Sequence, residues 1–268
     1  MAKVDILLPY WGNVELLKKA IESVLAQTED DWRLLVFDDC YPSPEPAKYF
    51  ESIKDKRVIY NRHPKNLGIT KNFNFALGQA MADYCVMFGC DDIMLPNYIE
   101  TALAKIGDAD FYQPQVDVID ANGTVYLPLG DRIKKFLRPK KSGTHKGEGL
   151  AISLCRGNWL YFPSIMWRTE TIKKYGFDDQ YKIVEDVVLE LDIIKDGGRL
   201  HLDNTTTFQY RRSSGSLSSV EKSKDGIRFS EEKGVYNQFS KTFRRMGWRR
   251  ASFAASARIT SRVNQWIS

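Results

Sequence analysis

The sequence predicts an α/β protein built on an open, mostly parallel sheet, with a basic helical extension at its C-terminal end. Short apolar runs typical of buried parallel strands recur through the first third of the chain, and segments with helical spacing of apolar residues separate them. The third observation is a charge asymmetry. Residues 241–268 hold seven Lys and Arg and no Asp or Glu, so the total of +5 leaves residues 1–240 with a formal charge of −2.

The composition is that of a folded, cytoplasmic protein. The chain has 268 residues, of which 43% are hydrophobic and 27% charged, which argues against general disorder. Its four cysteines form no CxxC pair, which excludes a disulfide framework and a cysteine zinc site and favours a reducing compartment. The first apolar run is too short for a signal peptide, and no stretch approaches the roughly 20 apolar residues that cross a bilayer. Because the basic charge is confined to one end, we expect no binding to nucleic acid.

Strand and helix patterns alternate through the first 92 residues. Strands are predicted at residues 4–8, 34–37, 57–60 and 84–88, and helices at 14–25, with Asn13 as the N-cap, and at 70–82. Strand, helix, strand, strand, helix, strand is the order expected of an open parallel sheet.

The middle of the chain is less regular. Strands are predicted at 111–118, 124–127 and 165–168, with an Asn122-Gly123 turn between the first two. Helices are predicted at 148–155, 169–175 and 186–195, and an extended segment at 200–210. Residues 130–149 are polar and rich in Lys, Arg and Gly, so we expect a mobile loop, which either orders over a substrate or has no such role.

Two pairs of carboxylates follow predicted strands. Asp38-Asp39 comes after the second strand and Asp91-Asp92 after the fourth, and ligands of open parallel sheets bind at such carboxyl ends. One Asp there is usually a turn or cap residue. Two pairs indicate a cation or a donor-rich ligand, because clustered like charges otherwise repel. Carboxylate oxygens suit Mg²⁺ or Mn²⁺ with a substrate diphosphate, whereas the three scattered His residues give zinc no support.

An ordered set of motifs between residues 3 and 218 resembles family-2 glycosyltransferases. The matching segments are Pro9-Tyr10-Trp11-Gly12-Asn13, residues 20–28, Val36-Phe37-Asp38-Asp39, Asn66-Leu67-Gly68, Lys71-Asn72, residues 87–92 and Glu185-Asp186. The resemblance implies the GT-A fold, a Rossmann-like sheet flanked by helices. It also implies inverting transfer of a sugar from a nucleotide diphosphate sugar, with UDP the commonest nucleotide, usually with a divalent metal.

The resemblance also assigns residues to the nucleotide. They are Pro9, Tyr10, Asp38, Asp39, Asn66, Lys71 and Asp91. Asp39 would accept a hydrogen bond from the base, with Asp38 in a supporting role. Lys71 stands where the family often has Arg, and it lacks the planar fork of a guanidinium.

Two departures from the family pattern concern the metal and the diphosphate. The first Asp of the Asp-X-Asp motif is Gly89 here, which makes Asp91 the expected ligand of Mn²⁺ or Mg²⁺ and Asp92 a helper, a cap or an acceptor contact. The late His of the family is Ser213 here. Arg211 or Arg212 would supply positive charge to the diphosphate instead.

Glu185-Asp186 stands before an apolar helical segment. From the residues alone, an acidic first turn that complements the helix dipole is as good an interpretation as a catalytic one. The resemblance makes Asp186 the catalytic base, which takes the proton of the attacking hydroxyl, and Glu185 an alternative base or an acceptor contact. It also favours Trp159 as an acceptor contact, against simple core packing.

The C-terminal end has two interpretations. Apolar residues from Phe239 to Ile267 alternate with Arg, so this segment is either a helix packed on the body or an amphipathic helix on anionic lipid headgroups. A saccharide or lipid-linked acceptor of envelope polysaccharide synthesis would place the enzyme at the inner face of the cell membrane. We divide the chain into a catalytic domain at residues 1–218, with a nucleotide half (1–92) and an acceptor half (93–218), and an extension at 219–268.

Two other function classes are weighed. A sugar nucleotidyltransferase would carry a Gly-rich basic loop after the first strand, where this chain has Pro9 to Asn13, so that class is disfavoured. If the chain were a non-catalytic nucleotide-sugar-binding or membrane-scaffold module, Gly89 and Ser213 would be signs that the active site has decayed. Retention of Asp39, Asp91 and Asp186 argues against decay.

Overall fold

The computed structural model describes residues 2–212 and 227–257, arranged around one sheet. The strand order is β3-β2-β1-β4-β8-β6-β9-β5, and β7 pairs with β9. The strands are β1 (Val4–Tyr10), β2 (Trp32–Asp38), β3 (Val58–Arg62), β4 (Tyr84–Met87), β5 (Ile93–Met94), β6 (Phe111–Ile119), β7 (Gly143–Lys146), β8 (Met166–Arg168) and β9 (Arg199–Arg211).

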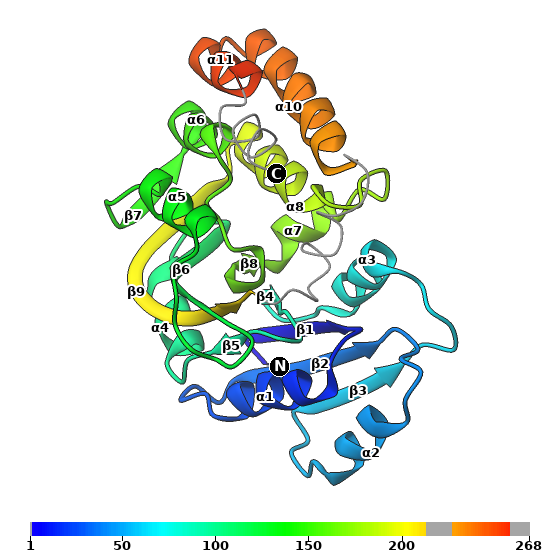
Figure 1. The fold of residues 1–268 in the computed structure, drawn as a ribbon. Helices are drawn as coiled ribbons and strands as arrows, with labels where there is room; N and C mark the ends of the chain where they lie inside the picture. The colour runs from blue at the N-terminus through cyan, green and yellow to red at the C-terminus, as the bar shows by residue number, and fades with distance from the viewer. Residues whose placement is uncertain (1, 213–226, 258–268) are drawn as a thin grey trace.

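Helices cover both faces of this sheet (Figure 1). They are α1 (Val14–Leu25), α2 (Glu45–Ser52), α3 (Ile69–Gln79), α4 (Tyr98–Ile106), α5 (Leu129–Leu137), α6 (Gly147–Arg156), α7 (Thr169–Tyr175), α8 (Glu185–Lys195), α10 (Ile227–Arg245) and α11 (Arg249–Ala257).

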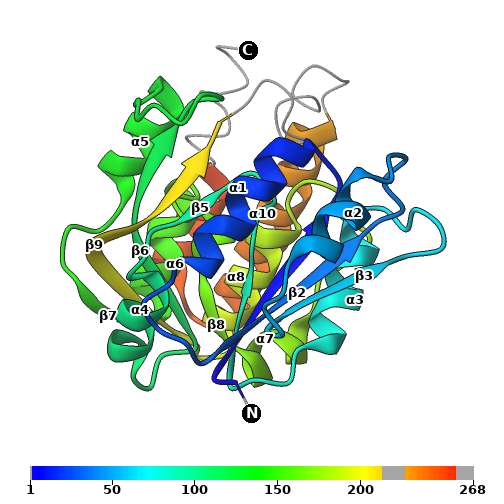
Figure 2. The ribbon, with the colours of Figure 1, turned by 90° about the horizontal axis from the view of Figure 1, so that it is seen from below.

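The pairing confirms the predicted mostly parallel sheet. β3, β2, β1 and β4 run parallel, with Tyr10 opposite Asp38 and Asp38 opposite Arg62, so their carboxyl ends share one edge. β8 runs antiparallel to β4 and β6, and the long, curved β9 lies parallel beside β6 (Figures 1 and 2). This arrangement brings the end of β9 back to the edge where β1, β2 and β4 end.

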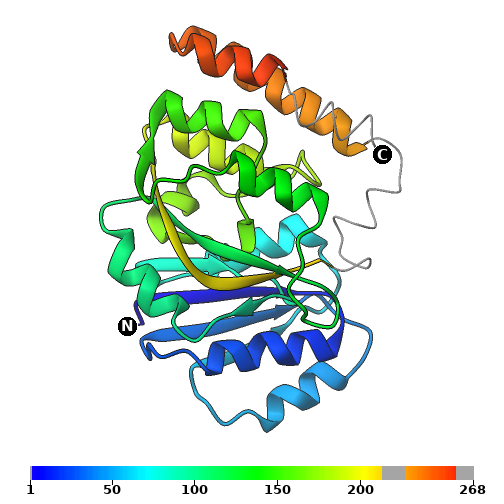
Figure 3. The same cartoon turned by 60° about the vertical axis from the view of Figure 1, so that its left-hand side comes forward.

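Two hydrophobic cores lie on opposite faces of the sheet. One joins the sheet to α1, α2 and α4. The other joins it to α3, α6, α7 and α8 and continues into α10 and α11, so that Figure 3 shows the C-terminal helices as an outer layer over α6 and α8. The sheet face under α8 therefore carries two successive layers of helix.

Most predicted elements are confirmed with small changes in bounds. α1 and α7 have the predicted bounds, and α6 and α8 lie within one residue of theirs. Asn13 caps α1 as predicted, because its Oδ1 accepts hydrogen bonds from the backbone N–H groups of Glu15 (2.8 Å) and Leu16 (3.1 Å).

Two predictions for the middle of the chain are wrong. Residues 130–149 form α5, β7 and the start of α6 instead of a mobile loop. Leu129, Ile133, Phe136 and Leu137 do have helical spacing in α5, but Leu129 and Phe136 are exposed, and the buried residue of the helix is the polar Asp131. Residues 124–127 form no strand, because Val125 makes only an isolated bridge to Ile119.

The described part of the C-terminal segment packs on the body. Phe239 and Phe243 of α10 are buried in the same core as α6 and α8, while Lys241 and the four Arg residues between positions 244 and 250 are exposed. Glu148 of α6 accepts hydrogen bonds from the first N–H groups of α11, at Arg250 (2.8 Å) and Ala251 (3.1 Å). The apolar residues from 259 onward lie outside the described residues, and the boundary at residue 219 stays a prediction.

Among the described residues, no helix combines the length and apolarity that crossing a membrane requires.

The packing of α10 makes a stability prediction. Phe243→Ala should lower the free energy of unfolding by about 3–5 kcal/mol, because the side chain is fully buried beside Phe239 and Trp248. Phe253→Ala on α11 is the matched control: this ring is 75% exposed, so the loss should stay within about 0.5 kcal/mol. Urea unfolding followed by circular dichroism measures both, and equal losses would contradict a shared core.

Candidate active site

Asp38 ends β2 and organises the turn behind it. Its buried carboxylate accepts hydrogen bonds from the backbone N–H of Tyr41 (2.7 Å) and from the Tyr60 hydroxyl. The Nε of Arg62 lies 3.7 Å from Oδ2. These contacts hold the turn and the neighbouring strand β3 in position, which is consistent with the supporting role expected of Asp38.

Asp39 holds the loop before α3. Its carboxylate accepts hydrogen bonds from the backbone N–H groups of Leu67 (2.6 Å) and Gly68 (2.9 Å), while Asn66 donates to its carbonyl oxygen (3.1 Å). Gly68 has a φ of +83°, in the left-handed region that favours glycine. Asp39 therefore fixes the segment that leads into α3.

Other residues assigned to the nucleotide lie at the same edge of the sheet. Pro9 is half-buried near the end of β1, and the buried Tyr10 donates its hydroxyl to the carbonyl oxygen of Gly12 (2.9 Å). Asn66 and Lys71 are exposed. The strand ends and the start of α3 thus form one polar border.

The turn after β4 holds both Asp91 and Asp92. A Cβ built on Gly89 would lie 2.4 Å from Asp92 Oδ2 and 3.6 Å from Asp91 Oδ1, so both carboxylates converge on this glycine. Burial raises the pKa of Asp91, and burial together with the Asp91 charge raises the pKa of Asp92 well above its usual value. The Asp missing from the family motif would occupy space that the Asp92 carboxylate fills.

Arg211, at the end of β9, holds this turn in place. Its backbone N–H donates to Asp92 Oδ1 (2.8 Å) and its Nε donates to the carbonyl oxygen of Asp91 (2.7 Å). Its Nη1 donates to the carbonyl oxygens of Asp120 (2.7 Å) and Ala121 (3.2 Å). The residue is 3% exposed, so these carbonyls occupy the guanidinium that was assigned to a diphosphate, and that role stays a prediction.

Arg212 makes a two-pronged ion pair with Asp131 of α5. Its Nη2 and Nε donate to Asp131 Oδ1 (2.9 Å) and Oδ2 (3.1 Å), and the Tyr161 hydroxyl donates to Oδ1 (2.9 Å). Burial works against the charge of Asp131, but these donors hold the pKa of its carboxyl below the usual value. Ser213, where the family has His, lies outside the described residues.

Asp186 stands in the first turn of α8, where its Oδ1 accepts the backbone N–H of Val187 (2.7 Å). Burial raises the pKa of Asp186, and the charges of Lys134 and Arg228 oppose this shift. Burial, and then the charge of Arg212, lowers the pKa of Lys134 to about 8. A carboxyl with a raised pKa is suited to accept a proton near neutral pH.

Glu190 lies one helical turn after Asp186, and the charge of Lys134 acts on both carboxyl groups. Glu190 is 1% exposed, its Oε2 accepts a hydrogen bond from Asn158 (2.9 Å), and burial followed by the charge of Asp186 raises its pKa well above the usual value. The sequence signal that could have found it is the i, i+4 spacing from Asp186. Asp131 and Lys134 were missed because residues 130–149 were interpreted as a loop.

Two further predicted residues are largely enclosed. Glu185 is buried at the start of α8. Trp159 is 1% exposed, and its indole N–H donates to Ser153 Oγ (3.0 Å), although the ring also borders a cavity beside α5. Their roles as alternative base and acceptor contact stay predictions.

Electrostatic contacts connect the two ends of the site. The charge of Arg212 acts on Asp92 as well as on its partner Asp131, and Lys134 acts on both Asp131 and Asp186. These interactions run from the turn after β4, through Arg212, Asp131 and Lys134, to the start of α8, and the roles of the carboxylates stay predictions.

The residues after β4 fit a divalent cation only if substrate supplies ligands. Within residues 2–212 and 227–257, no three His, Cys, Asp or Glu side chains form a group that could enclose a metal. Mg²⁺ and Mn²⁺ are often bound through one or two carboxylates, water and substrate phosphates. Asp91 fits this pattern. Among the described residues, its carboxylate accepts no hydrogen bond from another side chain, and burial destabilises its negative charge.

Comparison with solved structures identifies the fold as GT-A. The Staphylococcus aureus protein TarS, residues 1–349 in complex with UDP-GlcNAc, matches 87% of this chain and 65% of its own chain, with a TM-score of 0.67 and 15% identity. The mannosyltransferase PcManGT of Pyrobaculum calidifontis, in complex with GDP-Man and Mn²⁺, matches 96% of this chain and 69% of its own, with a TM-score of 0.67 and 11% identity. At these identities the likeness concerns the fold.

The chain belongs to glycosyl transferase family 2, whose family model matches residues 5–169. An uncharacterized glycosyltransferase of Methanocaldococcus jannaschii is 28% identical over 172 residues, which cover 61% of this chain and 54% of the relative. The putative colanic acid biosynthesis glycosyl transferase WcaA of Escherichia coli is 31% identical over 102 residues, which cover 38% of this chain and 37% of WcaA. The chain thus spans about half or less of these two relatives.

The close packing at Gly89 makes a second prediction. Gly89→Ala should lower the free energy of unfolding by about 1–3 kcal/mol, because a Cβ would meet Asp92 Oδ2 at 2.4 Å. Gly78→Ala in α3 is the matched control: a Cβ there meets nothing within 4 Å, so the variant should gain up to about 1 kcal/mol. Thermal unfolding of both variants measures this, and an unchanged Gly89→Ala protein would refute the packing argument.

Proposed function

We propose that this protein is an inverting, metal-dependent glycosyltransferase that moves a sugar from a nucleotide diphosphate sugar, UDP-linked in the first instance, to a hydroxyl of a saccharide or lipid-linked acceptor. One observation carries the proposal: Arg212 at the end of β9 pairs with Asp131 of α5 (2.9 Å) and acts on Asp92 after β4, while Lys134 of α5 acts on Asp186. That arrangement supplies a place for the leaving diphosphate beside a proton acceptor.

The relatives support the choice of donor and pathway. TarS was solved in complex with UDP and with UDP-GlcNAc, and PcManGT in complex with GDP-Man and Mn²⁺. WcaA and the Rhizobium meliloti protein ExoW carry names from colanic acid and succinoglycan biosynthesis. An acceptor in envelope polysaccharide or glycolipid synthesis is the corresponding expectation for this chain.

In the proposed reaction, the nucleotide binds along the ends of β1 and β2. The base meets the border formed by Pro9, Tyr10 and Asp39, and Asp39 also keeps the Leu67-Gly68 loop in position for it. Lys71, exposed in the first turn of α3, offers positive charge to the nucleotide. Asp38 acts through the turn that it stabilises.

The sugar is transferred between the β4 turn and α8. A divalent cation held by Asp91 would stabilise the charge that develops on the departing diphosphate. Asp186 takes the proton of the acceptor hydroxyl as that oxygen attacks the anomeric carbon. Before this transfer, the positive charge of Lys134 stabilises the ionised form of Asp186. Arg212 remains bound to Asp131 and adds positive charge beside Asp92.

Asp186→Asn tests the proposed base. The variant should lower nucleotide release from a UDP-sugar in Mn²⁺ by about 10²- to 10⁴-fold, since it cannot take the proton, while UDP affinity changes little. Asp179→Asn is the matched control, because this exposed carboxylate stands in the loop before α8. Asp91→Asn should weaken both Mn²⁺-dependent UDP binding and release.

The same experiment separates the rival function. UDP binding that raises the melting temperature, without release or transfer for any donor tested, would favour a non-catalytic nucleotide-sugar-binding module. Full activity of the Asp186→Asn protein would refute the assignment of the base.

We also propose that the exposed basic side of α10 and α11 attaches the protein to an anionic membrane surface. Arg244, Arg245, Arg249 and Arg250 are exposed there, and Phe253 is 75% exposed, whereas Phe239 and Phe243 face the core. Because those two rings are buried, attachment would depend on charge more than on an inserted apolar face.

Charge neutralisation tests this attachment. Changing the four Arg residues to Gln should weaken sedimentation with phosphatidylglycerol vesicles at least tenfold, since each basic residue near such a surface contributes about 1 kcal/mol. A control with Lys19, Lys54, Lys56 and Lys65 changed to Gln alters net charge equally on exposed positions elsewhere. Equal losses for both proteins, or binding that neither set changes, would refute a specific basic face.

A further inference from the structure

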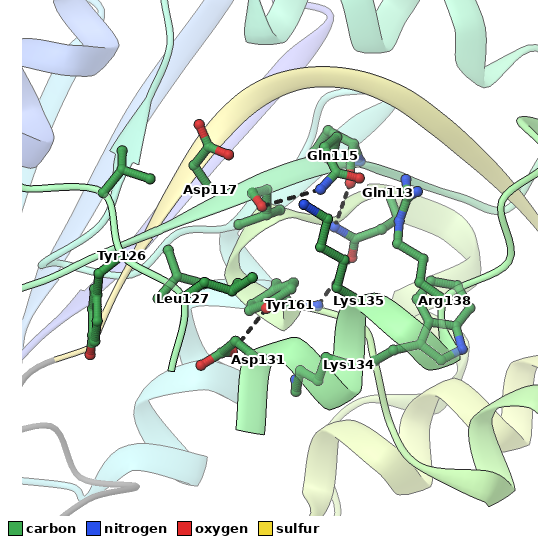
Figure 4. A pocket seen from close by; sticks show the side chains of 15 residues that line it. Gln113, Gln115, Asp117, Tyr126, Leu127, Asp131, Lys134, Lys135, Arg138 and Tyr161 are labelled. Atoms are coloured by element: carbon green, nitrogen blue, oxygen red, sulfur yellow. Dashed lines mark hydrogen bonds between the residues drawn. The ribbon is translucent and has the colours of Figure 1, made fainter. Parts of the chain in front are cut away.

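A cavity of about 320 Å³ lies between α5 and β6, beside the proposed acceptor side (Figure 4). Its volume is at the lower end of the range for small-molecule sites. Gln113 and Gln115 line it from β6, Tyr126 from the segment after β6, and Trp159 and Tyr161 from the segment after α6. Amide and aromatic side chains together suit the polar and apolar faces of a sugar ring.

Three cations, two on α5 and one on the residue that follows it, border this cavity without a carboxylate partner. Among the described residues, Lys134, Lys135 and Arg138 make no ion pair within 4.0 Å. Lys134 donates to the carbonyl oxygen of Leu160 (2.7 Å) and lies over the Tyr161 ring, and Arg138 donates to Asn204 Oδ1 (2.8 Å) and to the carbonyl oxygen of Asp203. Burial lowers the pKa of Arg138, so its charge lacks full compensation.

The carboxylates at the same cavity do not cancel this charge. Asp131 is already paired with Arg212 through both oxygens. Figure 4 shows Lys135 of α5 and Arg138, directly after this helix, extending toward Gln113 and Gln115, whereas Asp117 lies farther along β6 with its carboxylate directed away from them. The inner part of the cavity is therefore electropositive.

The cavity shares a wall with the proposed catalytic region. Lys134 lines it and acts electrostatically on Asp186, and Asp131 lines it while binding Arg212. Lys134 and Asp131 are therefore shared between the wall of the cavity and the proposed catalytic region.

We propose that this cavity binds the anionic group, a carboxylate or a phosphate, of an acidic saccharide acceptor. Lys135 and Arg138 contact the anion, and the Gln115 amide, whose only hydrogen bond among the described residues is a long one to the Val116 carbonyl oxygen (3.5 Å), donates to a sugar hydroxyl. This assignment rests on the proposed glycosyltransferase function, and it deepens that function by specifying the charge of the acceptor.

A binding experiment without turnover tests it. The full chain, saturated with UDP and the diamagnetic Mg²⁺ to occupy the donor site, is titrated by NMR with glucuronate, glucose 6-phosphate and glucose up to about 50 mM. Either anion should bind about tenfold more tightly than glucose at low salt, because charge-assisted hydrogen bonds are stronger than neutral ones. Glucuronate reports a carboxylate site and glucose 6-phosphate a phosphate site.

Variants locate the binding. Lys135→Ala should reduce the affinity for the anion about tenfold and remove its preference over glucose, whereas Lys141→Ala, an exposed lysine beyond α5, should leave both unchanged. Arg138→Met gives an independent second reading, with melting temperatures as the check on folding. Equal binding of all three sugars, binding of none, or loss in neither cavity variant would overturn the proposal. Failure of UDP to bind would count against the proposed donor site only. The cavity can still be tested in that case, because glucuronate can be titrated without UDP.

Discussion

The site depends on one buried cation, Arg211, which ties the end of β9 to the turn after β4 and to the residues after β6. The two carboxylates of that turn are destabilised by burial and by each other, so the turn needs a nearby positive charge and donors directed at it. A strand that curves back from the far side of the sheet provides both. The sheet topology and the electrostatics of the site are therefore linked, because the parallel pairing of β6 and β9 brings Arg211 and Arg212 to the turn.

The missing motif residue has a structural counterpart. Where the family has an Asp, Gly89 leaves room for the Asp92 carboxylate to lie against the backbone, and Arg211 engages its other oxygen. Asp91 is left as the one carboxylate of the turn free of side-chain hydrogen bonds within the described residues, which suits a cation whose remaining ligands come from substrate. Gly89 in place of Asp therefore changes the packing of the turn and leaves Asp91 as the proposed ligand.

The sequence predicted the parts of this structure whose signal is local. Buried parallel strands read as apolar runs, and the carboxylates at their ends follow from the geometry of parallel sheets, so β1 to β4 and the positions of Asp39 and Asp91 were accessible. α5 was missed although Leu129, Ile133, Phe136 and Leu137 have helical spacing, and the contacts of Asp131 and Lys134 with Arg212 and Leu160 lie far along the chain. Lys134 was missed together with this helix. The i, i+4 spacing from Asp186 was a local signal for Glu190, but its contact with Asn158 comes from the fold. Arg211 was recognised as a site residue, but its partners, four backbone or carboxylate oxygens of other segments, could be known only from the fold.

The outer layer of helices also interacts with the region around Asp186. Glu231 of α10 accepts hydrogen bonds from the backbone N–H groups of Lys182 (3.1 and 3.2 Å) and Ile183 (3.0 Å), immediately before α8, and Arg228 of the same helix acts on Asp186. α10 therefore supports the segment that leads into α8 and acts electrostatically on Asp186, the proposed base, although it lies outside the strands proposed to bind the nucleotide. With Asp186 as the base, selection on the speed of transfer would extend to this helix, and substitutions in it would change the rate while leaving donor recognition intact.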